Sequence, residues 1–151
     1  MKLMGLDYGS KTVGVAISDD LLFTAHPVET IKRESENKLR KTLARITTLV
    51  SENHVEKIIL GLPLLPDGSE GERAEKTREF QTMLEKRTGL EVILVDERFT
   101  TDASIEELKE MGVAKEDRKT FVDQLAACHI LDDYLNRIQE EKSRDQNKNT
   151  E

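Results

Sequence analysis

The sequence predicts an α/β protein built on one mixed five-stranded sheet. Two observations support this fold class. Three strand patterns at residues 3–8, 12–18 and 23–31 follow one another with short links, which is typical of an antiparallel meander. After them, helical and strand patterns alternate, which is typical of strands joined by crossover helices. A chain of 151 residues fits one domain of this kind, and we expect that domain to span residues 1–139.

The first strand pattern ends in a carboxylate. Its apolar run reaches Asp7, turns at residues 9–11, and returns as a run rich in β-branched residues. Gly5 and Gly14 lie inside these two strands, and a glycine there indicates a bulge or the close approach of another backbone. The third strand contains Pro27, which cannot donate to a neighbouring strand, so we expect it at the edge of the sheet.

Periodicity, glycine and proline place the remaining elements. In chain order we expect a helix at 35–53, a buried strand at 57–62, a loop at 63–71, a helix at 72–88, a strand at 91–95, helices at 101–111 and 120–139, and a polar, disordered tail at 140–151.

Composition and charge exclude several classes of protein. The formal net charge is -7, which argues against a protein that coats nucleic acid by neutralising its phosphates. A nuclease remains possible, because bound metal ions reverse the local sign of an acidic site. Cys128 is the single cysteine, which excludes an intrachain disulfide and a thiolate metal cluster. No apolar run reaches the ~20 residues of a membrane span, so we expect a soluble, cytoplasmic protein.

Three acids stand at the ends of predicted elements. Asp7 lies on the first strand, Glu97 follows the fifth strand, and Asp123 lies on the otherwise apolar face of the last helix. Carboxylates gathered at one edge of a sheet need cations to stay ionised. Mg²⁺ and Mn²⁺ prefer oxygen ligands, and two such ions about 3.5–4 Å apart can assist phosphodiester hydrolysis. The pattern therefore favours a metal-dependent nuclease.

Each acid also has a simpler interpretation. Asp7 could cap the turn that follows it. Glu97 could form a surface ion pair with Arg98, and Asp123 could do no more than interact with the dipole of its helix.

Basic residues near these acids are candidates for binding substrate phosphates. Arg73 and Lys76 are one helical turn apart beside a glycine-containing loop, and Arg98 adjoins Glu97. In that loop, Gly68 permits a phosphate to approach the backbone closely. The candidates for substrate binding are Lys11, Gly68, Arg73, Lys76 and Arg98.

Four blocks of sequence resemble one known family. They are Gly5-Leu6-Asp7-Tyr8-Gly9 with residues 14–19, Gly61-Leu62-Pro63 with residues 67–71, Asp96-Glu97-Arg98-Phe99-Thr100-Thr101, and Asp123-Gln124-Leu125-Ala126-Ala127. In this order they resemble the YqgF family, also called RuvX, whose members are pre-16S rRNA nucleases and homologues of Holliday junction resolvases in the RNase H-like superfamily.

The resemblance implies an RNase H-like fold, with sheet order 3-2-1-4-5 and helices on both faces. It implies a nuclease dependent on Mg²⁺ or Mn²⁺ that trims the 5′ end of pre-16S rRNA, with Asp7, Glu97 and Asp123 as catalytic and metal-binding residues. In that order the fifth strand is two strands, about 10 Å, from the first. Asp67 or Glu70, from the loop after the fourth strand, could therefore replace Glu97 as the second acid.

Other functions remain open at this stage. The protein could resolve Holliday junctions, which needs a symmetric dimer, so a monomer would favour RNA processing. It could also bind structured RNA, the pre-ribosome or branched DNA without cutting. The segment around Asp7 is also similar to the phosphate-binding hairpin of actin-like sugar kinases, but these need two such lobes. The oligomeric state, monomer or homodimer, is left open.

Overall fold

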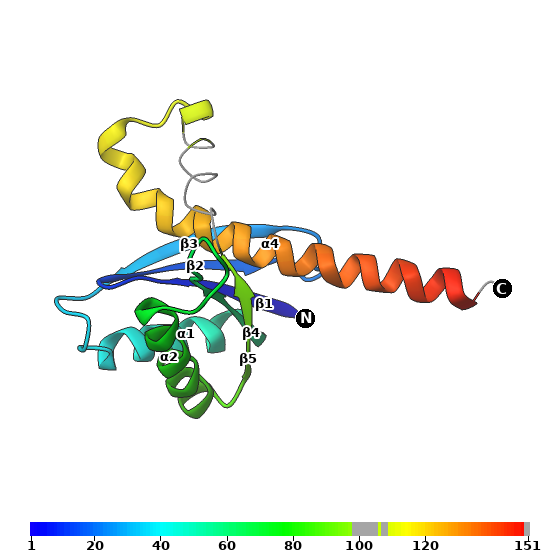
Figure 1. Cartoon of the computed structure of the whole chain (residues 1–151), viewed down its shortest axis with the longest axis horizontal. Coiled ribbons are helices and arrows are strands. Elements are labelled where there is room, and N and C mark those ends of the chain that lie inside the picture. Colours follow the sequence, from blue (N-terminus) through cyan, green and yellow to red (C-terminus); the bar gives the residue numbers. More distant parts are fainter. Residues whose placement is uncertain (98–105, 107–108, 150–151) are drawn as a thin grey trace.

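The protein folds around a five-stranded sheet with strand order β3-β2-β1-β4-β5, as predicted. The structure is a computed structural model that describes residues 1–97, 106 and 109–149. Figure 1 shows the sheet and its helices. The strands are β1 (Lys2–Tyr8), β2 (Thr12–Ser18), β3 (Ala25–Lys32), β4 (Val55–Leu62) and β5 (Glu91–Asp96), and the helices are α1 (Arg40–Asn53), α2 (Glu72–Thr88) and α4 (Lys115–Asn149).

The strands pair as a meander joined to a parallel unit. β1 pairs antiparallel with β2 and parallel with β4, and β4 pairs parallel with β5. β3 forms the outer edge, where Pro27 lies opposite Ala16 beside a register shift. The prediction of an edge strand is therefore correct, and the central strand β1 carries Asp7 near its carboxyl end.

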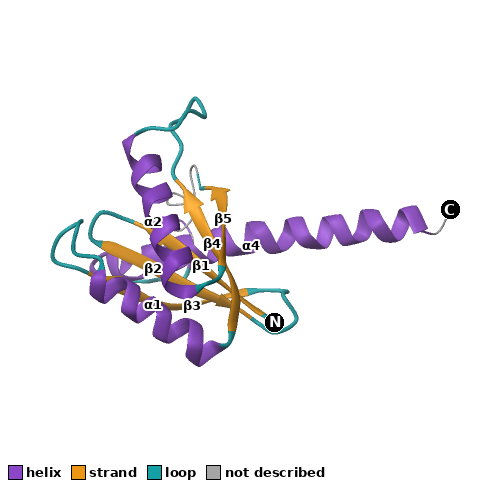
Figure 2. Ribbon diagram, turned by 90° about the horizontal axis from the view of Figure 1, so that it is seen from below, coloured by secondary structure: helices purple, strands orange, loops and turns teal. Residues whose placement is uncertain are grey.

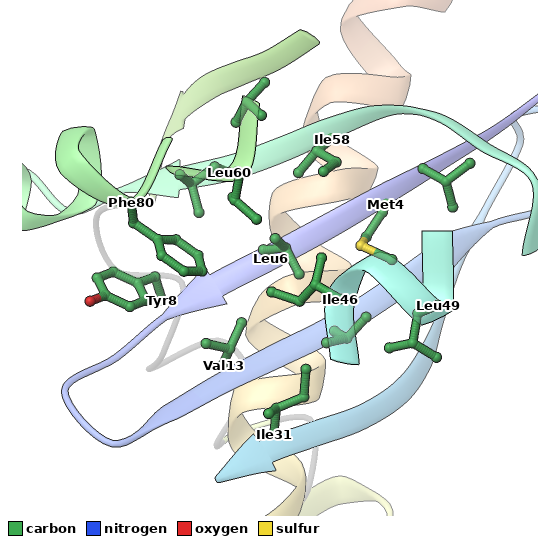
Figure 3. Close-up of a cluster of buried hydrophobic side chains, with 14 of the residues drawn as sticks. Met4, Leu6, Tyr8, Val13, Ile31, Ile46, Leu49, Ile58, Leu60 and Phe80 are labelled. Carbon is green, nitrogen blue, oxygen red and sulfur yellow. The ribbon is translucent and has the colours of Figure 1, made fainter. Parts of the chain in front are cut away.

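Two apolar layers enclose the sheet, one on each face. Helices α1 and α2 cover one face and α4 crosses the other, as Figures 1 and 2 show. On the α1 and α2 side, Figure 3 shows Leu6, Ile46 and Phe80 packed between strands and helices. On the α4 side, Leu3 and Ile59 pack against the helix. Because successive residues of a strand face opposite layers, Asp7 faces α4 and Tyr8 faces α2.

The starts of two helices differ from the sequence prediction. Helix α1 begins at Arg40 rather than at 35, because the segment before it turns twice, with Lys38 N–H donating to the Ser35 carbonyl at 3.1 Å and Leu39 N–H donating to the Asn37 carbonyl at 3.1 Å. Helix α4 begins at Lys115 rather than 120. Most of the predicted helix at 101–111 lies outside the described residues.

Residues 140–149 continue α4, where the sequence analysis expects a disordered tail. The segment is rich in glutamate, lysine, glutamine and arginine, which have high helix propensity, so a helix already nucleated against the sheet can extend through it. It projects beyond the sheet in Figure 1.

Among the described helices, none combines the length and the apolar character that crossing a membrane requires.

Candidate active site

Asp7 is a half-buried carboxylate on the face of β1 that α4 covers. Its neighbours on this face are small, because α4 passes directly over the strand. A side chain at Gly5 would place its Cβ 2.7 Å from the carbonyl oxygen of Ala127 and 2.8 Å from Cβ of Leu131. The helix backbone therefore shields Asp7 from water on one side, and the close approach predicted for Gly5 is confirmed.

Glu97 reaches Asp7 across the intervening strand β4. The Glu97 N–H donates to the Leu62 carbonyl at 3.2 Å, which extends the β4–β5 pairing beyond the end of β5. Its side chain then lies over Gly61, where a Cβ would be only 2.6 Å from Oε2 of Glu97 and 2.5 Å from Cδ1 of Ile130. Because Gly61 has no side chain, the path from β5 to β1 is open on this face.

The two carboxyl groups form a hydrogen-bonded pair in which the protonated Glu97 side chain donates to Asp7. Burial raises the pKa of Asp7 to about 6, and the charge of Asp123 adds to the increase. Burial and the charge of Asp7 raise the pKa of Glu97 to about 9. Arg73 opposes both shifts but does not cancel them. Two acids in contact in a desolvated place share a proton unless a cation replaces it.

Asp123 approaches the pair through the backbone of α4. The helix packs so tightly on β2 that a Cβ on Gly14 would lie 1.8 Å from the carbonyl oxygen of Asp123. Gly14 is the register partner of Asp7 in the β1–β2 ladder. The bare backbone at Gly14 thus places Asp123 beside Asp7, and its charge acts on Asp7.

The side chains of Asp7 and Glu97 have the oxygen donors that a hard divalent cation prefers, but Asp123 does not complete a three-residue metal site with them in this structure. Within the described part of the chain, no three His, Cys, Asp or Glu side chains form a group that could hold a metal ion. Asp7 and Glu97 are in contact, and all their donor atoms are oxygens. Such a pair fits Mg²⁺ or Mn²⁺, which also keep water ligands.

The alternative second acids point elsewhere. Glu70 accepts a hydrogen bond from Nε of Arg78 at 2.5 Å, and Asp67 accepts one from the Ser69 amide at 2.9 Å. Both acids are exposed. Glu97 is therefore the acid that joins Asp7 in this structure.

The predicted phosphate-binding residues are spread over this end of the sheet. Arg73, at the start of α2, is close enough for its charge to act on both Asp7 and Glu97. Lys76 lies on the next turn and pairs with Glu36 at 3.3 Å. Lys11 is exposed at the β1–β2 turn, and Gly68 is exposed in the β4–α2 loop with a φ of 89°. Arg98 lies outside the described residues.

The structure adds residues that the sequence analysis did not select. Arg33 follows β3 and lies over the Tyr8 ring, with its guanidinium carbon 4.9 Å from the ring centre. Glu36 accepts from both Arg73 and Lys76. The position of Arg33 in the sequence was a signal for this role, because Arg33 directly follows the predicted edge strand of the meander. In the structure, the preceding residue Lys32 pairs with Thr12, beside the β1–β2 turn.

Comparison with known proteins places this chain in a family. A family model for RuvX, described as "Holliday junction resolvase", matches residues 1–137. The chain belongs to the RuvX family. A relative from Agathobacter rectalis named "Putative pre-16S rRNA nuclease" is 52% identical over 143 residues, which cover 95% of this chain and 100% of the relative. A Listeria monocytogenes relative of the same name is 48% identical over 135 residues, 89% of this chain and 97% of the relative.

Solved structures confirm the RNase H-like fold of this RuvX protein. Thermus thermophilus RuvC in complex with a Holliday junction substrate aligns with a TM-score of 0.55 and 13% identity, covering 91% of this chain and 96% of that one. The fowlpox virus Holliday junction resolvase aligns with the same TM-score and 15% identity, covering 91% and 99%. At these identities the comparison concerns the fold alone.

Proposed function

We propose that this RuvX protein is a nuclease dependent on Mg²⁺ or Mn²⁺ that hydrolyses phosphodiester bonds during maturation of the 5′ end of pre-16S rRNA. The observation that carries the proposal is the contact between Asp7 and Glu97. It joins two desolvated carboxyl groups, one on β1 and one directly after β5, and these strands are not neighbours in the sheet. Such a pair is costly for folding and is understandable where a cation binds. The names of the relatives supply the substrate class.

The roles of the side chains follow from their positions. Asp7 and Glu97 would hold the cations, and Asp123 would complete the ligand set from α4. When bound, two ions would supply an activated water and neutralise charge on the leaving oxygen. Arg73 stands on the α2 side of the acids, where its guanidinium can hold a phosphate oxygen. Lys76, Lys11, Arg98 and the backbone at Gly68 would extend this contact along the substrate.

Metal binding should be visible as a gain in stability. At a Mg²⁺ or Mn²⁺ concentration one hundred times its Kd, we expect the unfolding free energy to rise by about 2.7 kcal/mol. Glu97→Gln should fold at least as stably as the metal-free wild type, because the amide can still donate to Asp7, but should lose most of the metal-induced gain. Chemical denaturation with and without metal measures both. An equal gain in the two proteins would contradict the assignment of Glu97 as a ligand.

The activity itself is tested on a pre-16S rRNA fragment with Mg²⁺ or Mn²⁺. We expect the wild type to cut it, and Glu97→Gln to cut at least about a hundredfold more slowly because an essential ligand is lost. Glu70→Gln is the matched control, since it makes the same change at the alternative acid, and should retain wild-type activity. Loss of activity in Glu70→Gln with retention in Glu97→Gln would reverse the assignment.

A second candidate substrate is branched DNA. The family description favours it, and the same assay run on a four-way junction separates the two. Symmetric resolution requires two active sites, so a dimer by light scattering together with paired cuts would support a resolvase. A monomer that cuts only RNA supports rRNA processing. Binding that survives loss of all three acids, without any cleavage, would indicate a non-catalytic module. We place the protein in the cytoplasm, where ribosomes are assembled.

A further inference from the structure

Two of the cations proposed to bind substrate, Arg73 and Lys76, are already engaged by a carboxylate of the same chain. Glu36 lies in the turn between β3 and α1. Its carboxylate accepts a hydrogen bond from Nη1 of Arg73 and forms an ion pair with Nζ of Lys76 at 3.3 Å. These contacts lower the pKa of Glu36, so it is fully ionised at neutral pH. A substrate phosphate that used Arg73 and Lys76 would have to compete with Glu36.

Glu36, Arg73 and Lys76 form a charged cluster, and a second arginine, Arg33, contacts this cluster through Tyr8. The ring of Tyr8 stacks on Phe80 with centroids 4.1 Å apart, which fixes its position. Arg33 and Arg73 both lie over the Tyr8 ring, at 4.9 and 5.6 Å. Nη2 of Arg33 donates to the Gly9 carbonyl at 2.5 Å, and its Nε donates to the Glu36 carbonyl at 3.3 Å. The aromatic platform therefore holds two guanidinium groups beside the turn that follows Asp7.

Each of these arginines has unused hydrogen-bonding capacity. Nη1 of Arg33 and Nη2 of Arg73 are buried and have no hydrogen-bond partner among the residues that the structure describes. A buried donor without a partner is costly for folding. The carboxylate of Glu36 therefore does not satisfy all the hydrogen-bond donors of the two arginines.

The cluster is continuous with a basic pocket. Beside it lies a pocket of about 740 Å³, formed by residues 32–41 between the end of β3 and the start of α1 (the β3–α1 segment). Its lining contains Arg33 and one acid, Glu34. The other charged residues of the lining are four cations: Lys32, Lys38, Arg40 and Lys41. A second pocket of about 270 Å³ is lined by Tyr8, Glu36 and Lys76, and shares Asn37 and Leu39 with the first. In a chain of net charge -7, this concentration of positive charge fits a polyanionic strand.

We propose that Glu36 occupies the place of a nucleic-acid phosphate and is displaced from Arg73 and Lys76 when the substrate strand enters along the β3–α1 segment. This inference rests on the proposed nuclease function and adds Arg33 and Glu36 to its binding site. A phosphodiester resembles a carboxylate in having one negative charge shared by two terminal oxygens, and arginine binds both groups in the same forked geometry. Glu36 is half-buried and lies in a turn, so its side chain can leave without disturbing a helix or strand.

The test measures binding without cleavage. Affinity for a labelled single-stranded RNA is measured by fluorescence anisotropy in EDTA at several salt concentrations. Glu36→Gln should bind about tenfold more tightly than the wild type, the equivalent of 1.4 kcal/mol. For Glu36→Gln, the plot of log binding constant against log salt concentration should be steeper by about 0.7, because one more cation is available to a phosphate.

Matched variants separate this contact from a general effect of charge. Glu91→Gln makes the same charge change at the start of β5, outside both pockets, at an exposed side chain that pairs with Lys57 at 3.8 Å, and should change affinity much less. Glu36→Asp keeps the charge but shortens the reach to Arg73, and should bind RNA with intermediate affinity. In an Arg73→Gln background, the gain from Glu36→Gln should largely disappear.

The outcomes decide between displacement and a supporting role. If Glu36→Gln binds no more tightly than Glu91→Gln, or more weakly than the wild type, then Glu36 holds Arg73 in place and the proposal is wrong. Parallel cleavage assays with metal keep the two proposals apart. Cleavage without the Glu36 effect overturns only this inference, while the Glu36 effect without any metal-dependent cleavage overturns only the nuclease.

Discussion

Asp7→Asn is expected to reduce metal-dependent cleavage by about a thousandfold or more, the largest effect on activity of any single substitution in the proposed site. The amide has nearly the shape of the carboxylate but removes the charge that Glu97 and Asp123 surround. It also relieves the repulsion within the acid cluster, so the metal-free variant should unfold at a temperature equal to or above that of the wild type. Rates from single-turnover cleavage of pre-16S rRNA, with melting curves on the same samples, measure both effects.

The control for this substitution is Asp67→Asn. It makes the same chemical change at an exposed acid that accepts hydrogen bonds from the amide and the hydroxyl of Ser69, and it should leave the cleavage rate within about twofold of wild type, as surface substitutions generally do. If Asp7→Asn still cleaved at a comparable rate, Asp7 would be a structural acid that caps the β1–β2 turn. If cleavage is lost, the retained stability shows that the loss does not come from misfolding.

Gly14→Ala is expected to have the largest effect on stability. The added Cβ would lie 1.8 Å from the carbonyl oxygen and 2.2 Å from the carbonyl carbon of Asp123, both of which are backbone atoms of α4. Neither can move by a change of rotamer, so the helix must shift away from the sheet. We expect a loss of about 3 kcal/mol or more in unfolding free energy, or failure to fold, measured by urea denaturation.

A second glycine gives the comparison for this prediction. At Gly71, the cap of α2, the nearest atoms to an added Cβ are side-chain carbons of Leu65 at 3.5 Å, an ordinary contact, and its φ is -109°. Gly71→Ala should therefore change stability by less than about 1 kcal/mol. Equal stability losses in the two variants would show that α4 does not rest on β2 as closely as the structure indicates.

The architecture could be predicted from local patterns because each pattern is typical of one kind of element. Alternating apolar residues, the turn at residues 9–11 and Pro27 defined the meander and its edge strand. The end of α4 could not be predicted in this way. Residues 140–149 have no apolar face, and the sequence alone gives no sign that a helix begun against the sheet continues through them.

The candidate acids were found from their positions at the ends of elements, but their mutual contact was not. Asp7 stands on β1 and Glu97 directly follows β5, with β4 between the two strands, and the sequence left Asp67 and Glu70 as alternatives for the second acid. The absence of a side chain at Gly61 opens the path for Glu97, while Arg78 and Ser69 engage the alternatives.

The sequence by itself determined the fold class, the strand order implied by its family motifs, and the types of residue available for chemistry. Only the tertiary structure decided which of these residues meet. Strand pairing brings Gly14 beside Asp7, helix packing on that glycine carries Asp123 to the same place, and the turn before α1 sets Glu36 against Arg73. Such contacts depend on the distance between backbones that are far apart in the chain, and local sequence patterns carry no information about that distance.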